Sequence, residues 1–190
     1  EFWAKHRYNR ADPGVQAFFR QTAVYAIWDD HDVRNDFAGP SEPLMPVGRE
    51  AFLDYFPIVP PAEEPGRLYR RFRWGGALEV FILDTRQYRS HNTDRDGPDK
   101  TMLGAEQKRW LLAAVAGSSA TWKVVVTSVP LSIPTGRPVR DSWTSANFLG
   151  FPEPGAGFAA ERDAVLEAFR SAGVRNLVFL TGDAHPAEIL

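Results

Sequence analysis

The sequence has 190 residues, which is enough for one ordinary domain with a buried core. Hydrophobic residues make up 44% of it and charged residues 24%, a composition that excludes a disordered chain. The net charge of −2 excludes a strong general attraction to nucleic acid or anionic membranes. The absence of cysteine excludes disulfides, thiolate zinc sites and thiol catalysis, and no apolar run is long enough to cross a bilayer.

The N-terminal part of the chain begins with a helix signal. Asp12 is a suitable N-cap and Pro13 suits the first helical position, so we expect a helix over residues 12–19. An apolar run then predicts a strand at 23–28. Residues 37–47 are rich in glycine and proline, which is typical of a loop.

The next segments predict a short helix and a hairpin. Residues 49–56 place aromatic side chains on one helical face, and a proline ends the helix. A second proline-rich loop is expected at 57–66. Two glycines at 75–76 separate residues 68–74, which alternate aromatic and arginine side chains in part, from the apolar run 77–83, and this favours a β-hairpin.

The C-terminal half predicts alternating helices and strands, as expected for an α/β protein. Helices are expected at 104–116 and 158–172, and strands at 122–126 and 176–180. Residues 130–157 contain many prolines and glycines with little periodicity, so they predict one long loop. Trp143 within it either lines a substrate cleft or anchors the loop in a hydrophobic cluster.

Polar or ionisable residues follow four of the predicted strands. They are Asp29 to Asp32 after 23–28, Asp84 to Arg86 after 77–83, Thr127 and Ser128 after 122–126, and Thr181 to His185 after 176–180. In α/β sheets, sites form at the carboxyl ends of strands, where the following loops meet. Four such ends in one chain predict a shared site.

Carboxylates are densest directly after the first predicted strand. Asp29, Asp30, Asp32 and Asp36 surround His31 within eight residues, and like charges so close repel. A cation would neutralise them, and aspartate and histidine ligands suit hard or borderline cations. There is no Gly-x-Ser-x-Gly elbow and no glycine-rich phosphate loop, so nucleophilic serine chemistry and nucleotide binding are disfavoured.

Several motifs resemble those of one family. Residues 28–36, WDDHDVRND, resemble the Trp-Asp-Asp-His-Glu signature of PhoD-like alkaline phosphatases, which belong to the calcineurin-like metallophosphoesterases. Residues 83–89, LDTRQYR, resemble their Leu-Asp-Thr-Arg-x-Tyr-Arg segment, and residues 181–185 resemble the closing Gly-Asp-x-His. Residues 103–111 and 121–123 resemble their central helix and the strand after it. The motifs follow the family order over nearly the whole chain.

This resemblance implies a fold and a domain organisation. The family fold is an α/β two-sheet sandwich flanked by helices, and we expect residues 1–190 to form one incomplete metallophosphoesterase domain of this kind. The family's Gly-Asp-x-x-Tyr segment, whose aspartate bridges two metals, has no match before Trp28. We therefore expect the sequence to be part of a longer enzyme.

The resemblance also implies roles for individual residues, position by position. The expected metal ligands are Asp30, Asp183 and His185. His31 is expected to face the phosphate and act in catalysis, together with Arg86. Arg89 and Asn35 are expected to bind substrate, and Asp29, Asp32 and Asp84 to support these groups. Metallophosphoesterases usually carry a further, separate histidine after this strand, and here none directly follows the strand at 122–126. Its absence fits the oxygen-rich calcium site of the family.

The implied function is hydrolysis of phosphomonoesters or phosphodiesters, in which two cations hold a hydroxide in line with phosphorus. Calcium and iron(III) are the expected ions, with zinc, manganese and magnesium as alternatives. The expected partner is a small phosphate ester, without nucleic acid or a transmembrane segment. Family membership implies a secreted, periplasmic or cell-surface location.

Other interpretations remain open at this stage. The chain could be a non-catalytic metal-binding relative, an inert partial chain, or a lipid- or nucleic-acid-directed phosphodiesterase of the same superfamily. Asp30 with His31 could form a polar turn, Asp84 could cap its strand, and Arg86 and Arg89 could form structural salt bridges. His6 and His91 are expected to be ordinary surface residues.

Overall fold

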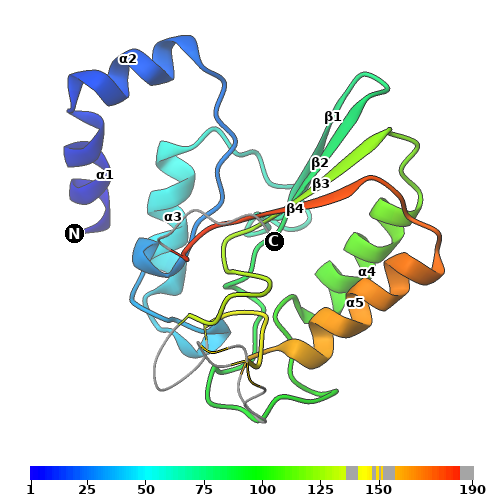
Figure 1. The fold of residues 1–190 in the computed structure, drawn as a ribbon. Coiled ribbons are helices and arrows are strands. Elements are labelled where there is room, and N and C mark those ends of the chain that lie inside the picture. Colours follow the sequence, from blue (N-terminus) through cyan, green and yellow to red (C-terminus); the bar gives the residue numbers. More distant parts are fainter. Residues whose placement is uncertain (136–140, 147–148, 150, 152–156, 185–190) are drawn as a thin grey trace.

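A four-stranded sheet runs through the computed structural model, with its strands in the order β1-β2-β3-β4 (Figure 1). The structure describes residues 1–135, 141–146, 149, 151 and 157–184. The strands are β1 (Arg70–Trp74), β2 (Leu78–Ile82), β3 (Trp122–Thr127) and β4 (Leu177–Thr181). β1 and β2 form the predicted antiparallel hairpin, whereas β2, β3 and β4 run parallel. The carboxyl ends of these three strands therefore meet at one edge.

The helices surround this sheet unevenly. They are α1 (Phe2–Arg10), α2 (Pro13–Gln21), α3 (Met45–Tyr55), α4 (Gly104–Ala116) and α5 (Ala159–Ser171), with short 3₁₀ turns η1 (Asp30–Asp32) and η2 (Gly39–Ser41). Figure 1 shows α4 and α5 side by side against the sheet, and α1 to α3 in a separate group. No helix in the described ranges combines the length and the apolar character that a membrane crossing requires. The mixed α/β class expected from the sequence is confirmed.

Strand register explains why α4 and α5 pack where they do. Phe81, Val125 and Phe179 lie in one row across β2, β3 and β4, on the face that packs against these helices. Leu111 of α4 and Phe169 of α5 belong to the same core and are nearly inaccessible to solvent. Burial of this apolar area is the main favourable contribution to the fold.

The opposite face of the sheet is also apolar, as parallel strands usually are. Val80, Val124 and Val178 form one row on it. Val178 is 38% exposed and Leu180 is 54% exposed, so this face is only partly covered by the residues described. The family resemblance implied two sheets, but residues 1–135, 141–146, 149, 151 and 157–184 contain one.

The first half of the chain differs from expectation in two places. α2 begins as predicted, with the Asp12 side chain accepting a hydrogen bond of 3.0 Å from the Val15 backbone N–H. Residues 23–28 are extended but form no strand, because they join no backbone ladder of the described sheet. The predicted loop at 37–47 contains η2 and the start of α3, which begins four residues earlier than expected.

Helix α1 was not predicted from the sequence, and it packs on α3. The Trp3 indole N–H donates to Asp54 over 2.6 Å, and the Tyr55 hydroxyl donates to the Trp3 carbonyl over 3.2 Å. The His6 ring stacks on Tyr55 with 4.9 Å between centroids. His6 was predicted to be an ordinary surface residue, but it is part of this aromatic contact.

A second hydrophobic cluster forms around Trp28. Trp28 is fully buried and packs edge-to-face on Phe37, with Phe52 and Leu68 nearby. Trp28 directly precedes the acidic stretch, so its burial fixes where Asp29 and Asp30 begin.

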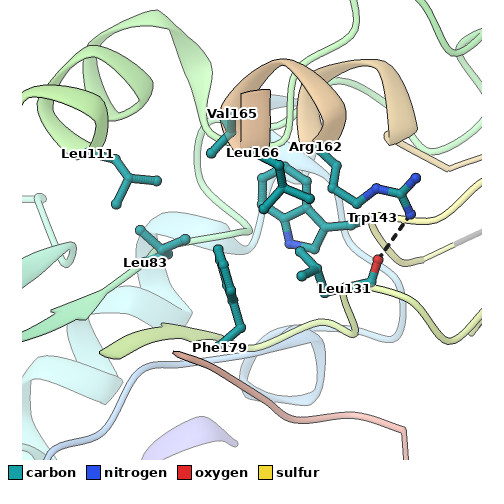
Figure 2. Close-up of a pocket in the computed structure, with 8 residues that line it drawn as sticks. All are labelled: Leu83, Leu111, Leu131, Trp143, Arg162, Val165, Leu166 and Phe179. Carbon is teal, nitrogen blue, oxygen red and sulfur yellow. Dashed lines mark hydrogen bonds between the residues drawn. The ribbon is translucent and has the colours of Figure 1, made fainter. Parts of the chain in front are cut away.

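The long loop after β3 is anchored by Trp143 (Figure 2). Its ring lies with Leu131, Val165 and Phe179 around a very small apolar space, and the residue is 3% exposed. The indole N–H donates 3.1 Å to the Thr127 hydroxyl. Of the two interpretations of Trp143, the loop anchor is confirmed, because its ring belongs to the core cluster.

Candidate metal centre

The site lies where the parallel strands end. Asp84 to Arg86 follow β2, Ser128 follows β3 and Asp183 follows β4, as the sequence predicted. The stretch after Trp28 reaches the same place, because Asp29 contacts both Arg86 and Ser128. The four polar segments therefore converge, although residues 23–28 are not a strand.

Asp84 attaches the acidic segment to the sheet. Its buried carboxylate accepts hydrogen bonds from the Trp28 indole at 2.9 Å, the backbone N–H groups of Arg86 and Gln87, and the Gln87 amide. The two interpretations of Asp84 are thus combined, since one carboxylate caps the end of β2 and holds Trp28. All four donors come from within the protein, so Asp84 is a structural clamp.

Three carboxylates form the group best suited to a metal ion. One oxygen from each of Asp29, Asp30 and Asp183 lies within 4.8 Å of the others. Sequence reasoning paired Asp30 with Asp183 as ligands and gave Asp29 a supporting role, whereas the geometry adds Asp29 to the group. His185, the third expected ligand, lies outside the described residues.

Asp30 is held in place by the turn that it starts. Its side chain accepts hydrogen bonds from the backbone N–H groups of His31 at 2.7 Å and Asp36 at 2.9 Å, and the residue is 4% exposed. The polar-turn interpretation therefore describes part of its role. A turn alone does not require further carboxylates beside it, and ionised oxygens retain other lone pairs for a cation.

The other residues expected in this stretch have distinct surroundings. The His31 side chain is 81% exposed, and its Nε2 atom lies 3.9 Å from Asp30 Oδ2. The Asn35 amide donates 2.9 Å to Asp36 and is exposed. Asp32 accepts the Asp29 backbone N–H at 2.9 Å, which closes the capping box of η1. His31 and Asn35 are thus accessible to a ligand, and Asp32 supports the turn.

Electrostatics within the group favour uptake of a cation. Burial raises the pKa of Asp29 to about 6, against the opposing effect of Arg86 and with repulsion from Asp30. Burial, followed by the charges of Asp141 and Asp30, also raises the pKa of Asp183. Ionised, these groups are repelled and partly desolvated, and a hard cation would relieve both costs. The oxygen-only set that the structure brings together therefore fits a metal of that type.

Backbone geometry adds a second sign of constraint. Asp36 and Asp183 have φ values of +56° and +62°, in the left-handed region. Aspartate tolerates this region better than most residues, but the conformation is uncommon outside turns and sites. Each of these residues contributes an oxygen to one of the acidic groups at this edge.

The two arginines expected to contact phosphate are both buried. Arg86 has no exposed surface, and its Nε atom donates 2.6 Å to Asp29 while its Nη groups face Asp141 and the Phe37 carbonyl. Arg89 is 2% exposed and binds Asp141, Asn92 and the Thr85 carbonyl. A direct contact with substrate would require either guanidinium to leave these partners.

Sequence reasoning missed Asp141. It is 1% exposed and forms a second acidic group with Asp30 and Asp36, whose oxygens also lie within 4.8 Å of one another. Burial opposes ionisation of Asp141, but Arg89 and Arg86 outweigh it and hold its pKa below the usual value. Because two guanidinium groups already compensate Asp141, the group with Asp29 and Asp183 is the better cation site. The one feature of the sequence that could have indicated Asp141 is its position two residues before Trp143.

A groove reaches the acidic group from the side of the sheet edge. It has a volume of about 350 Å³ and is lined by the ends of β3 and β4 together with Ile27 and Asp29. Asp183 also lines this groove. At its neighbour Gly182, an added Cβ would lie 3.0 Å from the Ser128 carbonyl oxygen. The candidate metal group is therefore open to small molecules from this side.

Comparison with known proteins identifies the family. Residues 1–189 match the family of PhoD-like phosphatases. This chain belongs to that family. It is 28% identical over 207 residues to alkaline phosphatase D of Bacillus subtilis (strain 168), a match that covers 95% of this chain and 34% of the relative. A solved structure of PhoD superimposes with a TM-score of 0.64 and 27% identity, over 84% of this chain and 34% of the other.

These matches confirm the family resemblance read from residues 28–36, 83–89 and 181–185. The chain spans about a third of the length of the PhoD-like relatives that it matches. The acidic group described above is thus a local feature of a PhoD-like chain.

The clamp role of Asp84 predicts a large loss of stability in Asp84→Ala. Four buried donors would lose their acceptor, and each unsatisfied buried group costs about 1–3 kcal/mol. We expect the free energy of unfolding, measured with urea, to fall by about 3 kcal/mol or more. Asp54→Ala is the matched control, because Asp54 also accepts from an indole but is exposed. A loss as small as that of the control would contradict the clamp.

The raised pKa of Asp29 predicts a pH dependence of the metal-free protein. Its carboxyl ionises at a higher pH when folded than when unfolded, so stability is lost as the pH rises from about 4 to about 7. The displacement corresponds to about 3 kcal/mol. Asp29→Asn removes this contribution. The unfolding free energy of the wild type should therefore fall by about 3 kcal/mol relative to that of the variant as the pH rises from about 4 to about 7.

Urea unfolding at a series of pH values, in the presence of a chelator, measures this difference. Asp163→Asn is the control, because the Asp163 side chain is 65% exposed. Parallel pH profiles for wild type and Asp29→Asn would show that Asp29 ionises normally in the folded state.

Proposed function

We propose that this chain is the part of a PhoD-like enzyme that holds metal ions and hydrolyses phosphate esters. The observation that carries the proposal is the group of Asp29, Asp30 and Asp183 beside an accessible imidazole, His31. Membership of the PhoD-like phosphatases supports phosphate-ester chemistry in general. Phosphomonoesters and phosphodiesters are the proposed substrates.

Asp30 and Asp183 would bind the metal, with Asp29 as a third oxygen donor and His185 as a further ligand by family resemblance. When bound, such ions polarise a phosphoryl group and stabilise the charge that develops on its oxygens during hydrolysis. Calcium and iron(III) are the ions that we propose, since all three described donors are hard oxygen ligands. Zinc, manganese and magnesium are the alternatives.

His31 would supply proton transfer. Its imidazole is exposed next to the metal group, and histidine is the residue that most often transfers protons in catalysis. We propose that it contacts a phosphate oxygen and donates a proton to the leaving group. The exposed Asn35 amide lies in the same turn and could bind a further phosphate oxygen.

Arg86 and Arg89 receive a different assignment from the one made on sequence. Both guanidinium groups are enclosed by protein partners, so we assign neither to the substrate. Arg86 would instead keep Asp29 in place. A secreted, periplasmic or cell-surface location is proposed from the family resemblance.

Replacement of His31 tests the proposed function. In the full natural polypeptide, we expect His31→Ala to lower kcat toward p-nitrophenyl phosphate and bis(p-nitrophenyl) phosphate by about 10²–10⁴-fold, the usual contribution of a general acid. Binding of metal, measured by elemental analysis, should be kept because His31 is not a proposed ligand.

The matched control is His91→Ala. His91 is exposed, and its ring contacts Thr93 rather than the acidic group. Its replacement should leave turnover unchanged. Full activity of His31→Ala on both esters would overturn the catalytic assignment.

A further inference from the structure

The carboxylates of Asp29 and Asp141 both accept hydrogen bonds from the Arg86 guanidinium. Arg86 is completely buried and sits between the two acids. It donates from Nε to Asp29 Oδ1 at 2.6 Å and from Nη1 to Asp141 Oδ1 at 3.2 Å, while Nη2 lies 2.9 Å from Asp141 Oδ2. The guanidinium thus gives one N–H to Asp29 and turns its two Nη groups to Asp141.

This division leaves one oxygen of Asp29 unbound by Arg86. The hydrogen bonds from Arg86 and from the Ser128 hydroxyl, at 2.6 and 2.9 Å, both end on Oδ1. Neither of these two donors binds Oδ2. Arg86 therefore leaves the second oxygen of Asp29 to the acidic group that Asp29 forms with Asp30 and Asp183.

A guanidinium beside a lone carboxylate commonly takes both oxygens at once, in two parallel hydrogen bonds. Arg86 would compete with a cation for Asp29 if it did so. Asp141 binds the Nη groups of Arg86 on the other side, and Arg89 adds a second positive partner to Asp141.

Asp141 itself is fixed by the loop that carries it. Its backbone N–H donates 2.9 Å to the Thr135 carbonyl, and two residues later Trp143 is buried in the core. The Trp143 indole bonds to Thr127, the neighbour of Ser128. The loop is thus held to the same strand end that orients Asp29.

We propose that Asp141 is a positioning residue, which acts through Arg86 to keep one oxygen of Asp29 available to a cation. The inference rests on the proposed metal-binding function. It assigns a role to the long loop after β3 that neither the family match nor the sequence motifs provide.

A double-mutant cycle in the full natural polypeptide tests this role, with Ca²⁺ as the probe and calorimetric titration of metal-stripped protein as the readout. We expect Asp141→Asn to weaken Ca²⁺ binding by about 10- to 100-fold, the usual effect of a group that supports a ligand. In an Arg86→Gln background, where no guanidinium remains to compete, the same substitution should change the affinity by less than about 2-fold.

Two control variants separate positioning from stability. Glu161→Gln alters another buried carboxylate, which accepts backbone N–H groups of Met102 and Leu103 away from the site, and should leave Ca²⁺ affinity unchanged. Arg89→Gln keeps the pair between Asp141 and Arg86 and should also retain affinity. If Asp141→Asn does not fold, the comparison is made with Asp141→Asn/Arg89→Gln, which buries one positive charge fewer.

Three results would overturn the inference. An equal loss in both Arg86 backgrounds would mean that Asp141 acts on the cation directly. An unchanged affinity in Asp141→Asn would make the ion pairs purely structural. A wild-type protein that binds no Ca²⁺ would overturn both this inference and the metal site, whereas one that binds Ca²⁺ but cleaves no ester would remove only the proposed hydrolysis.

Discussion

The buried guanidinium of Arg86 is the interaction on which this end of the molecule depends. It joins the segment after Trp28 to the segment after β2 through Asp29, and joins both to the long loop through Asp141. Burial disfavours an isolated charge, so Arg86 is stable there only because two carboxylates face it. Burial lowers the pKa of its guanidinium, yet the charges of Asp141 and Asp29 outweigh that effect and raise it. Three distant parts of the chain are thereby held at one point.

The density of acids after Trp28 therefore has two kinds of compensation. Arg86 offsets part of the charge of Asp29, and backbone N–H groups hold Asp30. Burial, with added repulsion from neighbouring carboxylates, still raises the pKa values of Asp29 and Asp183. The two acidic groups together contain Asp29, Asp30, Asp36, Asp141 and Asp183, and the ion pairs of Arg86 and Arg89 reach only Asp29 and Asp141 among them. A hard cation between Asp29, Asp30 and Asp183 would supply the missing positive charge where the arginines do not reach.

Much of this arrangement could be predicted from sequence, because strand direction decides which residues meet. Once β2, β3 and β4 are parallel, Asp84, Ser128 and Asp183 must lie at one edge. Pairing between strands is not local information, so the apolar run at 23–28 was misassigned as a strand. α1 buries no residue, and its N-cap residue Glu1 makes no side-chain cap hydrogen bond, so no pattern marked it. Asp141 lies in a loop without periodicity, and only the tertiary fold shows that it meets both arginines.

The structure leads us to propose that the carboxylates at this edge hold a metal ion. Anomalous X-ray diffraction from crystals of the full natural polypeptide, recorded across the absorption edges of calcium and iron, would locate that ion. We expect an anomalous peak within coordination distance of the carboxylate oxygens of Asp30 and Asp183, with Asp29 on the same side. A protein whose metal lies elsewhere, or whose Asp30 and Asp183 contact only protein groups, would contradict it.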